Sequence, residues 1–293
     1  MTQLHESGWE VTGRPWHSYD SVAGEYERAW HPSFELVARD LLEVVALEPQ
    51  EAILDVGTGT GAVAAAAAER AEHTERGFIV GVDPSLPMLH RAREHTTARL
   101  AAARTPGLPF PARTFDVVVA NLVISHLERY ETGLSDMVRV LRPGGRLGVT
   151  TWGSLDDEPV DDGQQRQLTG IWQSVAGRFV DMDPAADVVD AAIPWEARFS
   201  DPAAVRGALE SSGLRDVDLQ ARTYRRCVPQ RDALAGSETS FWGRYLRHTL
   251  GDAEWSRFRR EVAVAAAEAL PDPITRVEQL LIGVGRKRFA TPS

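Results

Sequence analysis

Residues 53–61 read Ile-Leu-Asp-Val-Gly-Thr-Gly-Thr-Gly and are followed by an alanine-rich run over 62–68. A short apolar stretch, an acid, three alternating glycines and a strong helix former predict a strand that ends in a tight turn beneath a helix N-terminus. Glycine has no Cβ atom, so the backbone can adopt otherwise costly angles and approach a ligand closely. The stretch therefore predicts a nucleotide-binding turn.

The glycine spacing alone is compatible with more than one nucleotide. Gly57, Gly59 and Ala62 also satisfy the dinucleotide-binding fingerprint, which tolerates alanine at its last position. A nicotinamide-dependent oxidoreductase is therefore one interpretation of the turn, and other parts of the chain have to distinguish the ligand.

The composition bounds the class of protein. The chain has 293 residues, of which 43% are hydrophobic, so it can bury a substantial core in one large or two small domains. A formal net charge of -10 without a basic run argues against a nucleic-acid partner. Cys227 is the only cysteine, which excludes an internal disulfide and favours a cytoplasmic setting. Neither a signal peptide nor an apolar run of about 18 residues is recognisable, so we expect no membrane partner.

Short apolar strands and amphipathic helices alternate on both sides of the turn. Strands are expected over 52–56, 77–83, 100–103, 115–121 and 146–152. Helices are expected over 60–71, from Pro84 onward and over 134–141. This alternation predicts a parallel sheet with helices on both faces. The turn at 142–145 is expected to stop the last of these helices before the next strand begins.

The flanking segments have a different character. Residues 1–15 lack periodicity and are expected to form a flexible or ligand-ordered arm. Two helices, over 21–26 and 34–45, are expected to precede the first strand and could lie over the glycine turn as a cover. After Trp152 the pattern is mixed until Asp201-Pro202, an N-cap and first-turn proline that begin a helix.

The last third of the chain combines strands with an aromatic-rich helical insertion. A strand over 214–220, helices over 229–270 and a closing strand over 277–285 are expected. We divide the single domain into an arm and cover (1–50), an α/β core (51–152), an acceptor-side segment with the sixth strand (153–228), and the insertion with the closing strand (229–293).

Several motifs, in this order and spacing, resemble one family. They are 53–61, Val82-Asp83-Pro84-Ser85 with Met88, Leu108-Pro109-Phe110, 115–127, Leu141-Arg142-Pro143-Gly144-Gly145, and the closing strand pair. Together they resemble class I S-adenosylmethionine-dependent methyltransferases, most similarly the small-molecule branch that includes ubiquinone and menaquinone biosynthesis enzymes. The resemblance implies S-adenosylmethionine as cofactor and a Rossmann-like, mostly parallel seven-stranded sheet with an antiparallel last strand.

Two acids at predicted strand ends suit this cofactor. Asp55 precedes the turn, where it can orient the turn and meet the ammonium group of the ligand. Asp83 can accept hydrogen bonds from both ribose hydroxyls, because a carboxylate has two acceptor oxygens. The alternative for Asp83 is a helix N-cap, a position that also favours aspartate.

We predict a wider set of cofactor-binding residues. Its members are Gly57, Thr58, Gly59, Gly61, Pro84, Met88, Ala103, Arg104, Asn121, Leu122, Tyr19 and Tyr26. Met88 matches the position that contacts adenine, although methionine also fills irregular gaps in a core. Arg104 is a departure, because many relatives have in this segment an acid that receives the adenine amino group, and arginine cannot accept a hydrogen bond. A backbone carbonyl or packing would then have to hold adenine.

Candidates for the chemistry lie after the fourth strand and in the cover. Asn121 and Leu122 end that strand, where ligands of open parallel sheets bind and where the resemblance implies that methyl donor and acceptor meet. His126 follows on the loop as the candidate general base, with a surface or capping histidine as the alternative. Tyr19 and Tyr26, with His17 and His31, could contact cofactor or substrate, or the tyrosines could simply anchor the cover.

Metal and nucleophile chemistry have weaker signals. The acids within 156–162 are expected to form a solvated loop and not a cation site, because they lack a recognisable loop motif. No zinc spacing occurs among the histidines, and Cys227 has no evident base partner. We therefore expect neither a metal site nor a cysteine nucleophile.

The pattern as a whole predicts an enzyme that transfers a methyl group from S-adenosylmethionine to a small, largely apolar acceptor such as a natural-product or quinone-like metabolite. Aromatic residues between 152 and 270 could wall its pocket. The alternatives are the nicotinamide-dependent oxidoreductase and a non-methylating cyclase or binding protein on a methyltransferase scaffold. The last is motivated by Arg104 and by the lack of an unambiguous base.

Overall fold

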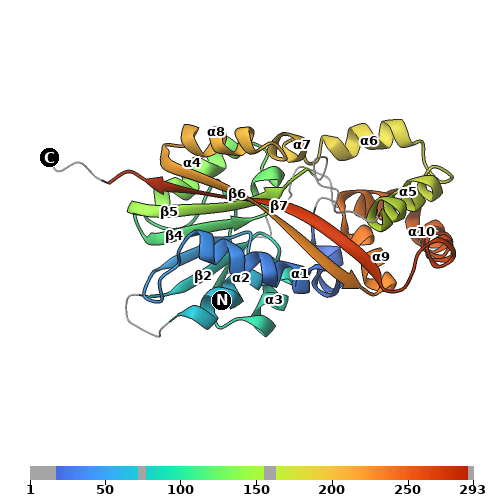
Figure 1. Ribbon diagram of the computed structural model, residues 1–293, viewed down its shortest axis with the longest axis horizontal. Coiled ribbons are helices and arrows are strands. Elements are labelled where there is room, and N and C mark those ends of the chain that lie inside the picture. The colour runs from blue at the N-terminus through green and yellow to red at the C-terminus, as the bar shows by residue number, and fades with distance from the viewer. Residues whose placement is uncertain (1–17, 72–76, 155–162, 290–293) are drawn as a thin grey trace, which may run out of the picture.

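One seven-stranded sheet organises the protein (Figure 1). The computed structural model describes residues 18–71, 77–154 and 163–289. The strands are β1 (Ile53–Val56), β2 (Ile79–Asp83), β3 (Arg99–Ala102), β4 (Phe115–Asn121), β5 (Leu141–Trp152), β6 (Leu214–Val228) and β7 (Ile274–Lys287). Their order is β3-β2-β1-β4-β5-β7-β6, and only β7 runs antiparallel to its neighbours. The predicted Rossmann-like sheet with an antiparallel last strand is confirmed.

Helices cover both faces of this sheet. They are the 3-10 turns η2 (Asp20–Val22) and η3 (Ile124–His126) and the helices α1 (Ala23–Val44), α2 (Ala62–Arg70), α3 (Leu86–His95), α4 (Tyr130–Val140), α5 (Gln164–Ala176), α6 (Met182–Asp190), α7 (Glu196–Phe199), α8 (Pro202–Ser211), α9 (Gln230–Thr239) and α10 (Phe241–Ala269). Alternate residues of β4 face opposite ways, as a pleated strand requires. Val117 and Val119 pack towards α1 and α2, whereas Val118 and Ala120 pack towards α4, α7 and α8.

The strand order places the motif residues together. Strand β1 lies between β2 and β4, so the sheet order reverses at β1, and a ligand crevice is expected at the carboxyl ends of these strands. Asp55 and the glycine turn follow β1, Asp83 ends β2 and Asn121 ends β4. The division of the chain into four segments stays a prediction.

The cover differs from the expectation of two helices. One 22-residue helix, α1, passes through Pro32, and only the three-residue turn η2 precedes it. Proline removes one helical hydrogen bond, but the face from Ala29 through Phe34 to Leu42 is buried along its length. Packing of this face holds the helix together across the proline. The expected arm at 1–15 lies outside the described residues.

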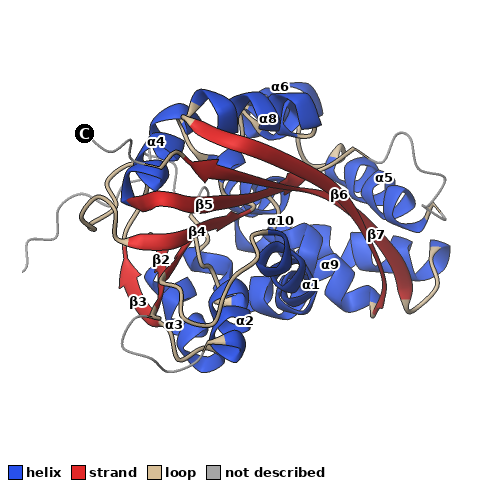
Figure 2. Cartoon of the chain, turned by 60° about the vertical axis from the view of Figure 1, so that its left-hand side comes forward, coloured by secondary structure: helices blue, strands red, loops and turns tan. Residues whose placement is uncertain are grey.

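Three strands extend beyond their expected limits. The turn at 142–145 lies inside β5, where the register with β4 shifts between Phe115 and Val117, so the turn is a bulge in the strand rather than a break before it. Strands β6 and β7 pair from Leu214 opposite Lys287 to Val228 opposite Ile274. Figure 2 shows them as a long curved ribbon that reaches α9.

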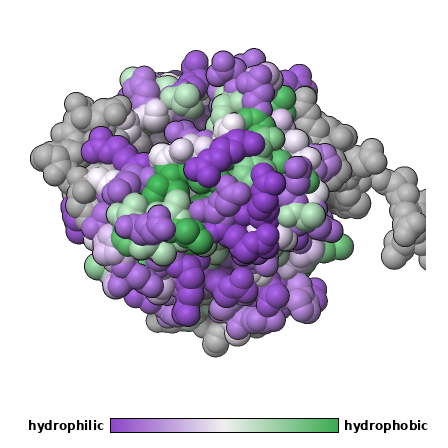
Figure 3. All heavy atoms as spheres, turned by 90° about the vertical axis from the view of Figure 1, so that its right-hand side faces the viewer, coloured by the Kyte–Doolittle hydropathy of each residue, from purple (hydrophilic) through white to green (hydrophobic). Residues whose placement is uncertain are grey.

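A second core forms where this ribbon meets the insertion. The mixed segment before residue 200 contains helices α5, α6 and α7, which the sequence pattern did not predict. Trp172 of α5 packs against Trp255 and Phe258 of α10 in one hydrophobic cluster. The outer face of this end of the molecule is mostly hydrophilic, with small apolar patches (Figure 3). Across 18–71, 77–154 and 163–289, no helix is long and apolar enough to span a membrane.

Candidate active site

The three glycines form a tight turn between β1 and α2. Their φ angles are 69° at Gly57, 53° at Gly59 and 88° at Gly61, a region that side chains rarely adopt. The Gly57 N–H donates to the carbonyl oxygen of Val82 at 2.8 Å, which fixes the turn to β2. A Cβ atom at Gly57 would stand 2.4 Å from Cγ2 of Val123. The turn therefore needs glycine both for its angles and for its space.

Asp55 lies buried beneath this turn. Its Oδ2 accepts a hydrogen bond from the Thr58 hydroxyl at 2.6 Å, whereas its Oδ1 has no hydrogen-bond partner among the described residues. Burial raises the pKa of Asp55 to about 7, although the Thr58 hydrogen bond opposes the shift. A buried acceptor without a donor is costly, so a ligand that supplied a proton donor or a cation would be bound favourably.

Asp83 joins the turn to helix α3. Its Oδ2 accepts from the Gly59 N–H at 2.9 Å and its Oδ1 from the Ser85 N–H at 2.8 Å, and Pro84 between them is exposed. The alternative role as N-cap is wrong, because the N-cap of α3 is Ser85, which accepts from the Met88 N–H. Each carboxylate oxygen can still accept a second hydrogen bond. Burial raises the pKa of Asp83 to about 6.

The candidate adenine-side residues divide into buried and exposed members. Met88 and Ala103 are buried, and the Ala103 N–H donates to the backbone oxygen of Asp83 at 3.2 Å. Arg104 is exposed. The chain after it is held by Asp136 of α4, whose carboxylate accepts from the N–H of Leu108 at 2.8 Å. This side of the site thus offers apolar side chains and backbone hydrogen-bonding groups, and it has no acid at position 104.

The end of β4 is tied to β5 through Thr150. The Thr150 hydroxyl donates to Oδ1 of Asn121 at 2.5 Å and accepts from the Leu122 N–H at 2.9 Å. Leu122 has a φ of 57°, so the chain turns sharply at this point. The Leu122 side chain packs in a cluster with Phe34 of α1, so the strand end and the cover meet here.

His126 lies in η3 on the loop that follows. Its ring stacks on Phe241 of α10 with centroids 5.3 Å apart, and the Tyr19 centroid is 6.3 Å away. His126 as a whole residue is exposed, but the protein packed around its ring desolvates the imidazole, and together with the charge of Arg244 this lowers the pKa of His126 to about 4. Such an imidazole is neutral at physiological pH and holds a proton poorly, which weakens it as a general base.

The cover contributes aromatic rings to the site and is tied to the α/β core by two side-chain hydrogen bonds. The rings of Tyr19 and Tyr26 pack edge to face at 5.2 Å. Burial raises the pKa of Tyr26 well above its ordinary value, so its hydroxyl stays neutral. The carboxylate of Asp20 in η2 accepts a hydrogen bond from the Ser85 hydroxyl, which ties the cover to the N-terminus of α3.

The second hydrogen bond joins α1 to the glycine turn. Nδ1 of His31 lies 2.9 Å from the Thr60 hydroxyl. Burial lowers the pKa of His31, with the nearby His95 as the next cause, so the neutral ring is favoured. His31 therefore ties the cover to the glycine turn. Among the described residues it makes no contact with the rings of Tyr19, Tyr26 or Phe241. His17 lies outside the described residues.

Arg244 of α10 belongs to the same cluster, a residue that the sequence analysis did not single out. Its side chain is 2% exposed, and its Cζ lies 3.8 Å from the ring centroid of Tyr19 and 4.3 Å from that of Phe241. Nε, Nη1 and Nη2 have no hydrogen-bond partner among the described residues. The available signal was a spacing of three from Phe241, which puts both residues on one helix face.

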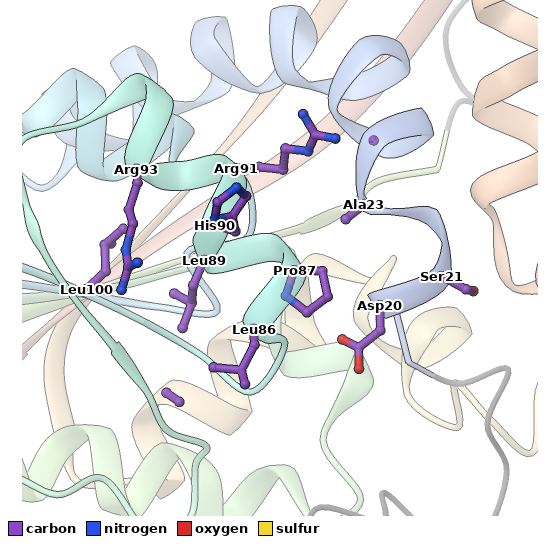
Figure 4. Close-up of a pocket in the computed structure, with 12 residues that line it drawn as sticks. Asp20, Ser21, Ala23, Leu86, Pro87, Leu89, His90, Arg91, Arg93 and Leu100 are labelled. Carbon is purple, nitrogen blue, oxygen red and sulfur yellow. The ribbon is translucent and has the colours of Figure 1, made fainter.

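A surface cavity of about 580 Å³ opens between η2, α3 and β3 (Figure 4). Asp20, Leu86, Pro87 and Ala102 are among its lining residues. Ala102 pairs with Asp83 in the register of β3 with β2. The cavity therefore borders the strand end that carries Asp83 and the cover that fastens to Ser85.

The part of the chain that the structure describes contains no group of three or more histidine, cysteine, aspartate or glutamate side chains that could hold a metal ion. The acidic stretch at 156–162 lies outside that part, so its solvated loop stays a prediction.

The left-handed glycine turn, the strand-end acid Asp83 and the sheet with an antiparallel β7 define a class I S-adenosylmethionine-dependent methyltransferase. Comparisons with known proteins agree. A methyltransferase domain matches residues 54–149. Nocamycin O-methyltransferase of Saccharothrix syringae is 31% identical over 295 residues, which cover 93% of this chain and 98% of that protein. The chain belongs to this family of S-adenosylmethionine-dependent small-molecule methyltransferases.

Two further proteins are similar over a different extent. Demethylmenaquinone methyltransferase of Thermus thermophilus is 41% identical over 102 residues, which cover 33% of this chain and 45% of that protein. Phosphoethanolamine N-methyltransferase 2 of Haemonchus contortus, solved in complex with S-adenosylmethionine, shares the fold with a TM-score of 0.52 at 15% identity, over 96% of this chain and 60% of that one. The family decides against the nicotinamide-dependent oxidoreductase that the glycine turn alone allows.

Proposed function

We propose that this enzyme methylates a natural-product or quinone-like metabolite. The names of its relatives support this class, since one acts on nocamycin and another on demethylmenaquinone. The observation that carries a methyltransferase site in this chain is the buried carboxylate of Asp83, with two acceptor positions next to the glycine turn. S-adenosylmethionine, when bound, supplies an electrophilic sulfonium methyl group.

The residues of this chain would hold that cofactor in a defined way. Asp83 would accept hydrogen bonds from the two ribose hydroxyls, and the unpartnered Oδ1 of Asp55 would accept one from the ammonium group. Met88 packs against adenine and Ala103 offers backbone, while the exposed Arg104 leaves the adenine amino group to a backbone carbonyl. The remaining proposed contacts are Gly57, Thr58, Gly59, Gly61, Pro84, Asn121, Leu122, Tyr19 and Tyr26.

The acceptor would lie between the cover and the insertion. Tyr19 and Tyr26 of the cover pack against each other there, and Tyr19 and His126 both lie next to Phe241 of α10. An apolar wall of this kind holds an apolar molecule and excludes water. Methyl transfer needs an aligned nucleophile above all, so positioning by these rings would supply much of the rate.

A calorimetric titration with S-adenosylmethionine and its demethylated product tests the cofactor, with NAD as the matched control. We expect binding of the first two and none of NAD. Labelled S-adenosylmethionine and an extract of aromatic metabolites then test transfer. Absence of both binding and label transfer would contradict the proposal. A product formed equally well with the demethylated cofactor would instead indicate a cyclase.

We also propose a cytoplasmic setting without a nucleic-acid partner. The single cysteine and the net charge of -10 support these two points.

Cofactor binding should strengthen as the pH rises from 6 to 8. The pKa values of Asp55 and Asp83, about 7 and about 6, lie above the ordinary 3.8, so both groups bind protons in the folded protein that the unfolded chain has released. The unliganded protein should therefore lose stability as the pH rises from about 4 to 7. A ligand that prefers the ionised acids releases those protons, and each released proton gives up to about tenfold in affinity per pH unit below the pKa of its group, so the gain should level off above about pH 7.

Calorimetry with S-adenosylhomocysteine in two buffers of different ionisation enthalpy measures this proton release directly. An affinity that is flat between pH 6 and 8, with the same heat in both buffers, would show that neither acid changes protonation on binding.

Replacing His126 with alanine should lower turnover by less than about tenfold. A well-matched general base contributes about 10²- to 10⁴-fold, but an imidazole with a pKa of about 4 cannot retain the proton it takes. Single-turnover rates at saturating acceptor measure the effect, with His248→Ala on the exposed face of α10 as the control. A loss beyond a hundredfold, together with a rate that depends on a group of pKa near 7, would restore base catalysis.

A further inference from the structure

Arg244 carries a positive charge that the described chain does not neutralise. Its three guanidinium nitrogens are buried and have no hydrogen-bond partner among the described residues. Desolvating a cation without hydrogen bonds is unfavourable, as the destabilisation caused by removing one partner of a buried ion pair shows. Contacts with the rings of Tyr19 and Phe241 offset only part of this cost.

Two acids of the insertion, Glu238 and Glu261, pair with other arginines. Glu238 of α9 pairs with Arg259 at 2.7 Å, and Glu261 of α10 pairs with Arg257 at 3.3 Å. Over residues 18–71, 77–154 and 163–289, no ion pair to Arg244 is formed. The guanidinium can therefore bind an anion that comes from outside the described residues.

The position of Arg244 indicates which ligand brings that anion. The guanidinium lies over Tyr19 from the cover and over Phe241, the ring on which His126 stacks. Its charge reaches His126, because it is the second cause of the lowered pKa of that ring. His126 follows the carboxyl end of β4, the side of the site assigned to the acceptor, whereas Asp83 lies at the end of β2.

On the basis of the methyltransferase function proposed above, we propose that Arg244 binds a carboxylate of the methyl acceptor, so that the enzyme selects acidic substrates. The planar guanidinium fork matches a carboxylate with two parallel hydrogen bonds, and such charge-assisted pairs are about twice as strong as neutral ones. The aromatic rings next to Arg244 would hold the apolar body of the same molecule.

An acidic acceptor also accounts for the chemistry of His126. A carboxylic acid is ionised at physiological pH without help, so no general base has to remove a proton. A carboxylate oxygen would form the bond to the methyl carbon as the bond from that carbon to the sulfonium sulfur breaks, and S-adenosylhomocysteine would leave. A neighbouring imidazole of low basicity then donates or accepts a hydrogen bond without competing for a proton. Desolvation and the charge of Arg244 lower the pKa of His126, and an acceptor that Arg244 binds as a carboxylate needs no general base.

Matched pairs of acids and amides test the proposal without knowledge of the natural acceptor. The probes are benzoate with benzamide and 2-naphthoate with 2-naphthamide, titrated by calorimetry into protein saturated with S-adenosylhomocysteine. We expect the wild type to bind at least one carboxylate tenfold or more tightly than its amide. Arg244→Met and Arg244→Gln should abolish this preference, whereas Arg247→Gln on the exposed side of the same helix should keep it.

Two further measurements separate binding from folding. Arg244→Met should melt no lower than the wild type, because it removes an unpartnered buried charge and keeps an unbranched side chain; a merely structural arginine would lower the midpoint. The affinity for S-adenosylhomocysteine should change less than threefold.

Three outcomes overturn the proposal: no carboxylate preference in the wild type, a preference that survives in Arg244→Met, or a tenfold loss of S-adenosylhomocysteine binding in that variant. The last would assign the guanidinium to the carboxylate of the cofactor itself. Failure of the wild type to bind S-adenosylhomocysteine is a separate result, and it contradicts the methyltransferase function instead.

Discussion

Replacing Asp83 with asparagine should weaken S-adenosylhomocysteine binding by at least a hundredfold. The side chain keeps its shape, but the amide has one acceptor oxygen where the carboxylate has two, and it carries no charge. Hydrogen bonds to a charged group contribute about 1.5–3 kcal/mol each, so the loss or weakening of two amounts to about 3–6 kcal/mol. Each 1.4 kcal/mol corresponds to tenfold in affinity.

A matched control is available within the same site. Asp20 also lies next to Ser85 and raises the pKa of Asp83, but we assign it no ribose contact. Asp20→Asn should therefore leave the affinity within about threefold of the wild type. Calorimetry on both variants, with melting curves to verify folding, gives the comparison. If Asp83→Asn bound S-adenosylhomocysteine as tightly as Asp20→Asn does, the ribose assignment would be wrong.

The residues around Asp83 were predictable because their pattern is local. A buried strand such as β1 or β2 needs a short apolar run, and a turn with three positive φ angles needs glycine at set positions. Asp55, Gly57 and Asp83 therefore stand out in sequence without any tertiary information. The parallel sheet order then brings the separate strand ends to one edge.

The parts that were not predictable depend on packing between distant segments. Pro32 signals a helix boundary locally, yet α1 continues through it because its buried face lies against the sheet and α2. The outer half of β6 is largely exposed and has no clear alternation, and it is held in an extended conformation by pairing with the distant strand β7. Such effects have no local signal.

The charge balance of the site is likewise a tertiary property. From the sequence, His126 after the fourth strand is a candidate general base, because the ordinary pKa of histidine is near neutrality. In the structure desolvation lowers the pKa of His126, and Arg244, which lies 118 positions further along the chain, lowers it further. Both causes depend on the packing of α10 against the loop after β4, so the local sequence around His126 does not predict that it is a weak base.

Replacing Gly57 with alanine should destabilise the protein by about 2–5 kcal/mol and remove cofactor binding. The φ of 69° costs an alanine about 1–2 kcal/mol. The new Cβ atom would stand 2.4 Å from Cγ2 of Val123, a short, stiff side chain, and such overpacking costs about 1–3 kcal/mol more. Denaturant unfolding of the variant and the wild type measures the sum.

The two causes can be separated with variants of the same chain. Gly213 has a φ of 93° with no atom near its Cβ position, so Gly213→Ala should show the backbone cost alone, about 1–2 kcal/mol. Val123→Ala removes the clashing methyl groups, so the double variant Gly57→Ala with Val123→Ala should recover about 1–3 kcal/mol relative to the sum of the single changes. Strict additivity would mean that the clash is relieved by movement of the turn itself, and cofactor binding would then fail even in the double variant.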